Sequence, residues 1–83
     1  MQVLHFSLDP GREFIELNQL LKLAGLADSG GAGKQLVAAG VVSVDGTVEL
    51  RKTAKIRAGQ AVTVDGAIIR VAAAGDANEG EAS

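Results

Sequence analysis

The sequence predicts an α+β fold in which two short helices pack on a small, mainly antiparallel sheet. Apolar residues follow a helical spacing in two segments, roughly 13–24 and 30–39. Two Asp-Gly pairs stand between β-branched residues, in VVSVDGTVE and VTVDGAIIRV, and this pattern is typical of tight β-hairpins. The 83 residues allow one small domain, and the 47% hydrophobic content must supply its core because the chain has no Cys.

The chain begins with a predicted strand, residues 2–8. Its alternate side chains Leu4, Phe6 and Leu8 share one face. Asp9-Pro10-Gly11 follows and predicts a turn, since Pro and Gly both favour turn conformations.

A helix is predicted from about Glu13 to Ala24. Lys22 lies in its last turn, where a cation suits the helix dipole, and Gly25 is suited to end it. Its apolar residues recur at intervals of three and four: Phe14, Leu17, Leu21 and Ala24.

The segment ADSGGAGKQLVAAG predicts a second helix, from about Gly30 to Ala39, with Asp28 or Ser29 as its cap. Its expected apolar face consists of Ala32, Leu36 and Ala39, with Val37 beside them. Glycine in a helix interior costs about 1 kcal/mol relative to Ala. The three glycines at this helix start therefore need another explanation.

Two explanations of these glycines, Gly30, Gly31 and Gly33, remain open. They would allow close packing on a neighbouring element, or they would leave helix N–H groups open to a phosphate, with Lys34 one turn further on. The GAGK segment does not match a nucleotide-binding phosphate loop. Asp28 stands where that motif has its first Gly, and Gln35 replaces its Ser or Thr.

The remainder is predicted to be strand and hairpin. The two VxVDG units lie 20 residues apart, and one favourable turn used twice explains them better than a duplication. AGQ at 58–60 predicts a further turn. The predicted domain spans residues 1–74, with eight bases and seven acids. Residues 75–83, GDANEGEAS, hold three acids and no base, and we expect a disordered acidic tail that solvates the protein rather than binding a partner.

Signals for enzyme chemistry are weak. The single His, His5, lies opposite the apolar face of the first strand, and Ser29 is better explained as a helix cap than as a nucleophile. Without Cys, a metal site would need carboxylates, but Asp45 and Asp65 are predicted turn residues. We therefore expect no catalytic residue, metal, cofactor or small-molecule substrate.

The first ten residues do not resemble a signal peptide, and no segment approaches the roughly 20 apolar residues that a membrane span needs. We therefore expect a cytoplasmic protein that does not bind membranes.

The stretch LRKTAKIR, residues 50–57, holds Arg51, Lys52, Lys55 and Arg57, half of the eight basic residues, and no acid occurs from 50 to 64. Basic residues can protect an edge strand from pairing with other chains. Four bases without an acid instead favour binding of a polyanion. Both Phe residues lie on core-facing patterns, which argues against base stacking and favours phosphate contacts with folded or double-stranded RNA.

These motifs resemble the RNA-binding domain named after ribosomal protein S-four, also called the alpha-L motif. In that pattern a Ser opens a short helix, a base follows five residues later, and an apolar pair and a Gly precede V-x-V-[ND]-G. Here these are Ser29, Lys34, Leu36 with Val37, Gly40, and residues 42–46. The bases of 51–55, then Ile56, Gly59, Gln60 and Val62 continue the pattern. LLKLAG and ELRKTAKI make the chain especially similar to the stand-alone bacterial YbcJ-like group.

The resemblance implies that the second helix and the loop after its hairpin lie side by side. The expected RNA-binding residues are then Lys22, at the rim, with Ser29, Lys34, Arg51, Lys52, Lys55 and Arg57. Many family members have an Arg at the position of Gly30, so more of the affinity would come from Lys34 and the 51–57 stretch. The resemblance also implies that acids lie away from this surface.

The sequence therefore predicts a small non-enzymatic protein that binds structured RNA, such as ribosomal or transfer RNA. Two alternatives are a protein-interaction module that uses the same basic face, and a detached appendage of an RNA-modifying enzyme. We expect a monomer, because the one non-polar face is used internally.

Overall fold

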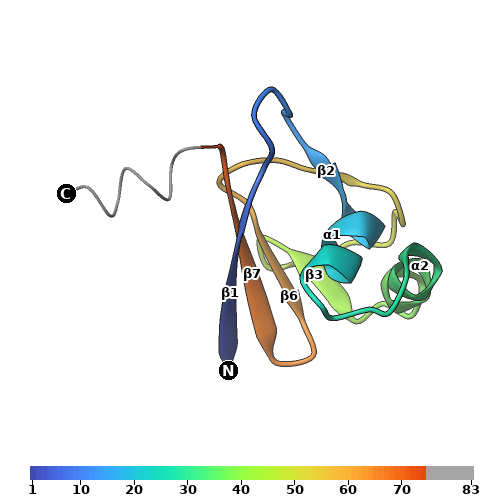
Figure 1. The fold of residues 1–83 in the computed structure, drawn as a ribbon. Coiled ribbons are helices and arrows are strands. Elements are labelled where there is room, and N and C mark those ends of the chain that lie inside the picture. The colour runs from blue at the N-terminus through green and yellow to red at the C-terminus, as the bar shows by residue number, and fades with distance from the viewer. Residues whose placement is uncertain (75–83) are drawn as a thin grey trace.

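A five-stranded sheet, with helices on one face, forms the framework of the protein (Figure 1). The computed structural model describes residues 1–74. Its elements, in chain order, are β1 (Gln2–Ser7), β2 (Ile15–Glu16), α1 (Leu17–Leu23), α2 (Gly30–Ala38), β3 (Val42–Val44), β4 (Thr47–Val48), β5 (Lys55–Ile56), β6 (Ala61–Val64) and β7 (Ala67–Ala72). The sheet order is β1-β7-β6-β3-β4, and β2 and β5 form a separate two-stranded ribbon. The acidic tail predicted for 75–83 lies outside the described residues.

The predicted α+β fold class is confirmed. The sheet is mainly antiparallel, and the pairing of β1 with β7 is parallel. The core lies between the inner face of the sheet and the two helices. Leu17, Leu20 and Leu21 of α1 and Val37 of α2 are fully buried. Val42, Val62 and Ile69, from three different strands, are fully buried in the same cluster.

The first helix begins later than the sequence predicts, at Leu17 instead of Glu13. Ile15 and Glu16 are extended, because they pair with Ile56 and Lys55 of β5. This pairing joins segments about 40 residues apart, which a local periodicity does not detect. The predicted end of the helix is confirmed. Gly25 has φ +81° and its amide donates to the carbonyl of Lys22 at 3.1 Å, while the Leu26 amide donates to Leu21 at 3.0 Å.

The second helix is close to its prediction. Ser29 is its cap, and its hydroxyl oxygen accepts a hydrogen bond from the Ala32 amide at 3.0 Å. The predicted apolar face is partly wrong, because Ala39 is exposed and the buried residues are Gly33 and Val37. The glycine therefore lies at the centre of the packed face.

Both predicted Asp-Gly hairpins are present with two-residue turns. Asp45 and Gly46 have φ of 51° and 86°, and Asp65 and Gly66 have φ of 49° and 81°. Positive φ at both positions is what a type I′ turn requires. The Arg57–Gln60 turn is also present, with a hydrogen bond of 3.2 Å from the Gln60 amide to the Arg57 carbonyl.

The outer face of the sheet bears on the expectation of a monomer. That expectation assumed a single non-polar face used internally. Val3 and Val48, on the two edge strands β1 and β4, are about half exposed, at 49% and 54%. Some apolar side chains therefore lie outside the internal face, and the monomer stays a prediction.

Candidate nucleic-acid interface

The loop that carries most of the basic residues is fixed by the start of α1. Glu16, the residue before α1, makes no side-chain cap. The first amides of α1 donate instead to the loop: Leu17 to the carbonyl of Ala54 at 2.8 Å, and Asn18 to that of Lys52 at 3.2 Å. These groups have no partner within the helix, so the loop satisfies them and gains a defined position in return.

The start of α2 lies against Asn18 of α1. A Cβ atom built on Gly33 would lie 2.5 Å from the backbone oxygen of Asn18, so only glycine fits this approach. The Asn18 side chain is buried, and its Nδ2 donates to the Gly30 carbonyl at 3.5 Å. Close packing therefore explains Gly33. A Cβ on Gly31 would meet no atom nearer than 3.8 Å, so packing does not explain that residue.

These contacts bring α2 and the basic loop against one residue, Asn18. Lys34 follows Gly33 directly, and Lys52 supplies the carbonyl that Asn18 contacts. Both lysine side chains are exposed, and neither forms an ion pair within residues 1–74. Lys22 lies one helical turn beyond Asn18 and is also exposed.

Arg51 departs from the expectation that acids lie away from the basic loop. Its guanidinium donates to both carboxylate oxygens of Glu49, at 3.1 and 3.0 Å, and its amide donates to Oε2 at 3.0 Å. The side-chain hydrogen bonds, followed by the amide bond, lower the pKa of Glu49 from its ordinary value near 4.5 to about 2. The expectation is wrong here because Glu49 stands just before the acid-free stretch.

Lys55 and Arg57 lie on an aromatic ring. Lys55 Nζ is 4.9 Å, and Arg57 Cζ 5.7 Å, from the centre of the Phe14 ring. These distances are typical of cation–π contacts. The prediction that Phe14 faces the core from a helix is wrong, because it precedes β2 and its side chain is half-buried. Ile56, between the two bases, is buried and pairs with Ile15.

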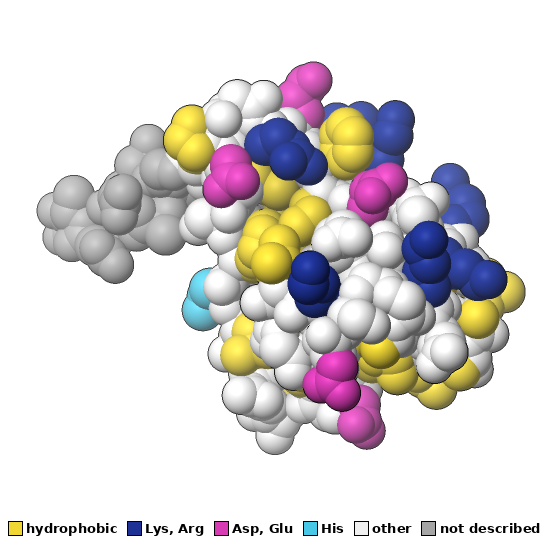
Figure 2. Space-filling model, turned by 45° about the vertical axis from the view of Figure 1, so that its right-hand side comes forward, with side chains coloured by type: hydrophobic (Ala, Val, Ile, Leu, Met, Phe, Trp, Pro, Cys, Tyr) yellow, Lys and Arg dark blue, Asp and Glu magenta, His cyan; other side chains and the backbone are white. Residues whose placement is uncertain are grey.

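Several of the predicted site residues lie in shared contacts. Arg51 and Lys55 line one open depression of about 480 Å³ over the loop. Lys55 and Arg57 share the Phe14 ring. Ser29 caps the helix that carries Lys34. Figure 2 shows Lys and Arg side chains over the upper and right-hand parts of one face, with Asp and Glu side chains between some of them.

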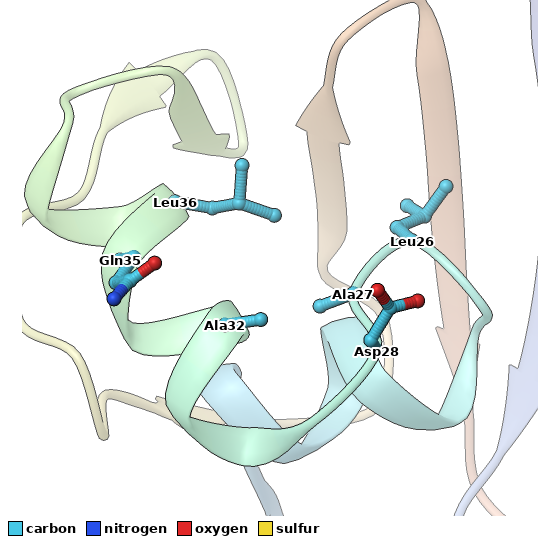
Figure 3. Close-up of a pocket in the computed structure, with 6 residues that line it drawn as sticks. All are labelled: Leu26, Ala27, Asp28, Ala32, Gln35 and Leu36. Atoms are coloured by element: carbon cyan, nitrogen blue, oxygen red, sulfur yellow. The ribbon is translucent and has the colours of Figure 1, made fainter.

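A separate groove of about 320 Å³ lies between α2 and the segment that precedes it (Figure 3). Leu36 and Ala32 of α2 point across it toward Leu26 and Ala27. Asp28 is the one charged residue among those lining it. A single carboxylate beside apolar side chains offers no acid–base pair, so the groove does not resemble an active site.

Two further observations concern residues 1–74. They contain no group of three or more His, Cys, Asp or Glu side chains arranged to hold a metal ion. None of their helices combines the length and the apolar character that crossing a membrane requires.

Comparison with known proteins identifies the family. Residues 8–72 match the family model described as S4 domain. The chain belongs to this family. It is 49% identical over 59 residues to YbcJ of Escherichia coli (strain K12), which covers 71% of this chain and 84% of that protein. YbcJ of Shigella flexneri matches to the same extent. The resemblance found in the sequence is therefore confirmed.

A solved structure agrees with this family assignment. The solution structure of YbcJ from E. coli, described as revealing an alpha-L motif involved in RNA binding, superposes with a TM-score of 0.64. The two proteins are 46% identical, and the match covers 82% of this chain and 85% of that one. The two helices and mainly antiparallel sheet described above are therefore the fold of an S4, or alpha-L, domain.

Proposed function

We propose that this protein is a small non-enzymatic RNA-binding protein that holds structured RNA, ribosomal or transfer RNA-like, through phosphate contacts. One observation carries the proposal. Lys34 and Lys52 are exposed, have no ion-pair partner in residues 1–74, and extend from two segments that both contact Asn18. The RNA-binding description of the similar YbcJ structure supports it.

Phosphate contacts fit this arrangement better than base reading. Lysine ammonium groups act as point charges toward phosphates, and fixed spacing between them selects the shape of the RNA backbone. Lys55 and Arg57 already lie over the ring of Phe14, which leaves that ring less free to stack on a base. We place Lys22, Ser29, Arg51, Lys55 and Arg57 around the two central lysines, with Arg51 contributing least because Glu49 holds it.

The proposal needs no cofactor, metal or small-molecule substrate, and it places the protein in the cytoplasm, where structured RNA is abundant. If four or five phosphates are neutralised, the logarithm of the binding constant should fall against the logarithm of salt concentration with a slope of about −3 to −4.

Charge reversal tests the proposal. Lys52→Glu combined with Lys55→Glu should abolish binding to a structured RNA such as bulk transfer RNA. The circular dichroism spectrum should remain that of the parent, and the unfolding temperature should fall only slightly, because the Lys55 contact with the Phe14 ring is lost. Arg70→Glu combined with Arg12→Glu is the matched control. It changes the net charge equally, at exposed positions outside the basic loop and α2, and should weaken binding only slightly. A Lys52/Lys55 double variant that binds as well as the parent would refute the site.

Capture from cell extract, with the same variants, tests the alternative of a protein-interaction module. Material captured from cell extract by the parent should be lost after ribonuclease treatment if RNA is the partner. Capture of a protein that survives ribonuclease, and that is lost in the double variant, would instead favour the protein-interaction module.

A further inference from the structure

The side chain of Asp45 joins the turn between β3 and β4 to the first residue of β6. The Asp45 amide donates to the Ala61 carbonyl at 2.8 Å, and the Ala61 amide donates to Oδ1 of Asp45 at 2.9 Å. In a regular antiparallel ladder the second of these bonds goes to a backbone carbonyl. Here the carboxylate accepts it, so this acidic side chain is part of the framework of the sheet.

The other carboxylate oxygen is linked to Arg57 through Gln60. Oδ2 of Asp45 accepts a hydrogen bond from Nε2 of Gln60 at 3.4 Å. Oε1 of Gln60 accepts one from the Arg57 amide at 2.7 Å. One side-chain amide therefore bridges a carboxylate of the first Asp-Gly turn and the backbone of a basic residue.

The side chain of Arg57 is held at a second point. Its Cζ lies 5.7 Å from the centre of the Phe14 ring, which also contacts Lys55. A long side chain loses conformational freedom when it binds a ligand, and restraint before binding reduces that loss. The bridge at the backbone and the ring at the guanidinium therefore prepare Arg57 to bind an anion.

We propose that Asp45 and Gln60 are positioning residues for RNA binding, which hold Arg57 where its guanidinium contacts a phosphate. This inference rests on the proposed RNA-binding function. It gives an acidic residue a favourable effect, although a carboxylate near phosphates weakens binding on charge alone. Removal of the Asp45 charge therefore has opposite effects in the two cases: it weakens binding if Asp45 positions Arg57, and strengthens binding if only charge matters.

Asp65 provides a matched control in the same chain. It occupies the same position in the second Asp-Gly turn, with φ 49° against 51° for Asp45, and both residues are exposed. Within residues 1–74 the Asp65 carboxylate accepts no hydrogen bond. Asn-Gly favours the same type of turn as Asp-Gly. Asp45→Asn and Asp65→Asn therefore remove the same charge, but only Asp45→Asn removes a link to Arg57.

Asp45→Asn must break the chain of hydrogen bonds, because an amide has one acceptor atom where a carboxylate has two. With its oxygen bonded to the Ala61 amide, the new side chain would set its NH₂ group against Nε2 of Gln60. Rotating the Gln60 amide would instead set a nitrogen against the Arg57 amide. Gln60→Glu added to Asp45→Asn should restore both bonds, since both oxygens of the new carboxylate accept. This double variant keeps the net charge of the parent.

Anisotropy titrations of bulk transfer RNA at several salt concentrations test the proposal. Asp45→Asn should weaken binding about threefold, and the salt slope should become shallower by up to about 0.9. Asp65→Asn should leave the affinity unchanged or raise it slightly. The double variant Asp45→Asn with Gln60→Glu should recover the affinity of the parent. Arg57→Gln should weaken binding at least as much as Asp45→Asn does, and adding Asp45→Asn to it should have no further effect.

The NMR signal of the Arg57 amide tests the link without RNA. It should move in Asp45→Asn, return in the double variant with Gln60→Glu, and stay in place in Asp65→Asn. An unmoved signal in Asp45→Asn would overturn the proposal.

The binding data have their own contrary outcomes. Equal effects of Asp45→Asn and Asp65→Asn, no recovery in the double variant, or additivity of Asp45→Asn with Arg57→Gln would each overturn the positioning role. General destabilisation explains neither the recovery nor the dependence on Arg57. A parent that binds no RNA would overturn the proposed function as well, whereas the contrary outcomes above leave that function intact.

Discussion

The two faces of the sheet are built in opposite ways. On the helix side, Gly33 and Asn18 bring backbones into direct contact, and the amides of Leu17 and Asn18 hold the basic loop. On the outer side, Val3 and Val48 are half exposed, and no helix of residues 1–74 covers them. Within residues 1–74 the two helices form one layer, and this layer covers one face of the sheet.

The two faces differ in how their side chains are held in position. Backbone hydrogen bonds set the positions of the charges on the helix side, so that side depends on a few close contacts. On the outer side, no such close backbone contact fixes the exposed side chains Val3 and Val48. We therefore expect substitutions on the helix side to change stability or RNA affinity strongly at particular positions. On the outer side we expect smaller changes that vary gradually with side-chain size.

The largest effect is expected at the contact between the helices. Gly33→Ala would place a Cβ 2.5 Å from the Asn18 oxygen, so α1 and α2 must separate. We expect a loss of about 2–3 kcal/mol in the free energy of unfolding, measured by urea denaturation. Gly31→Ala is the control, since its Cβ would meet no atom nearer than 3.8 Å. It should raise stability by up to about 1 kcal/mol. Equal effects of the two variants would contradict the close packing.

A second change tests how far Glu49 restrains Arg51. Glu49→Gln removes the carboxylate that holds the guanidinium while keeping a hydrogen-bond acceptor beside the Arg51 amide. RNA affinity should rise about threefold to fivefold, and the salt slope should steepen by up to about 0.9, the contribution of one added phosphate contact. Fluorescence anisotropy titrations at several salt concentrations measure both. Unchanged affinity would mean that Arg51 does not take part.

The contact of Lys55 with the Phe14 ring should contribute less to the free energy of unfolding than the packing at Gly33. A double-mutant cycle of Phe14→Leu with Lys55→Met should give a coupling of about 0.5–1 kcal/mol in unfolding free energy. The same cycle with Phe6→Leu should give none, because neither cation lies over that ring among the described contacts. Coupling of equal size in both cycles would show that burial, not the ring contact, is measured.

The smallest expected effect is the pH dependence of stability that comes from Glu49. The folded pKa of Glu49 is about 2, below its ordinary value near 4.5, so ionised Glu49 favours the folded state. Its contribution is present above about pH 4.5 and is lost as the pH falls toward 2. Because Arg51 is 81% exposed, we expect only a small contribution. The parent should unfold at a slightly higher temperature than Glu49→Gln at pH 6, and the difference should vanish near pH 2.

Local signals in the sequence predicted much of this fold. Ser29 as a helix cap, Gly25 as a helix end and the two Asp-Gly turns each depend on neighbouring residues, and all are present. The basic residues of 51–57 and Lys34 were also visible, together with the family resemblance. The structure adds the contacts through Asn18 that join their segments.

What the sequence did not predict depends on contacts between distant segments. The start of α1 was placed at Glu13 because helical spacing is blind to the pairing of Ile15 with Ile56. Phe14 was assigned to the core for the same reason. The hydrogen bonds between Glu49 and Arg51 depend on loop shape. That Val3 and Val48 share the outer face of the sheet follows only from the strand register.

The salt dependence of RNA binding by Lys34→Gln tests the central claim most directly, because it counts phosphate contacts at a single lysine. The account predicts a slope shallower than that of the parent by about 0.7–0.9, and an unchanged slope for Arg70→Gln on the outer sheet face. If the two variants have the same slope as the parent, Lys34 does not contact phosphate, and the proposed interface is contradicted.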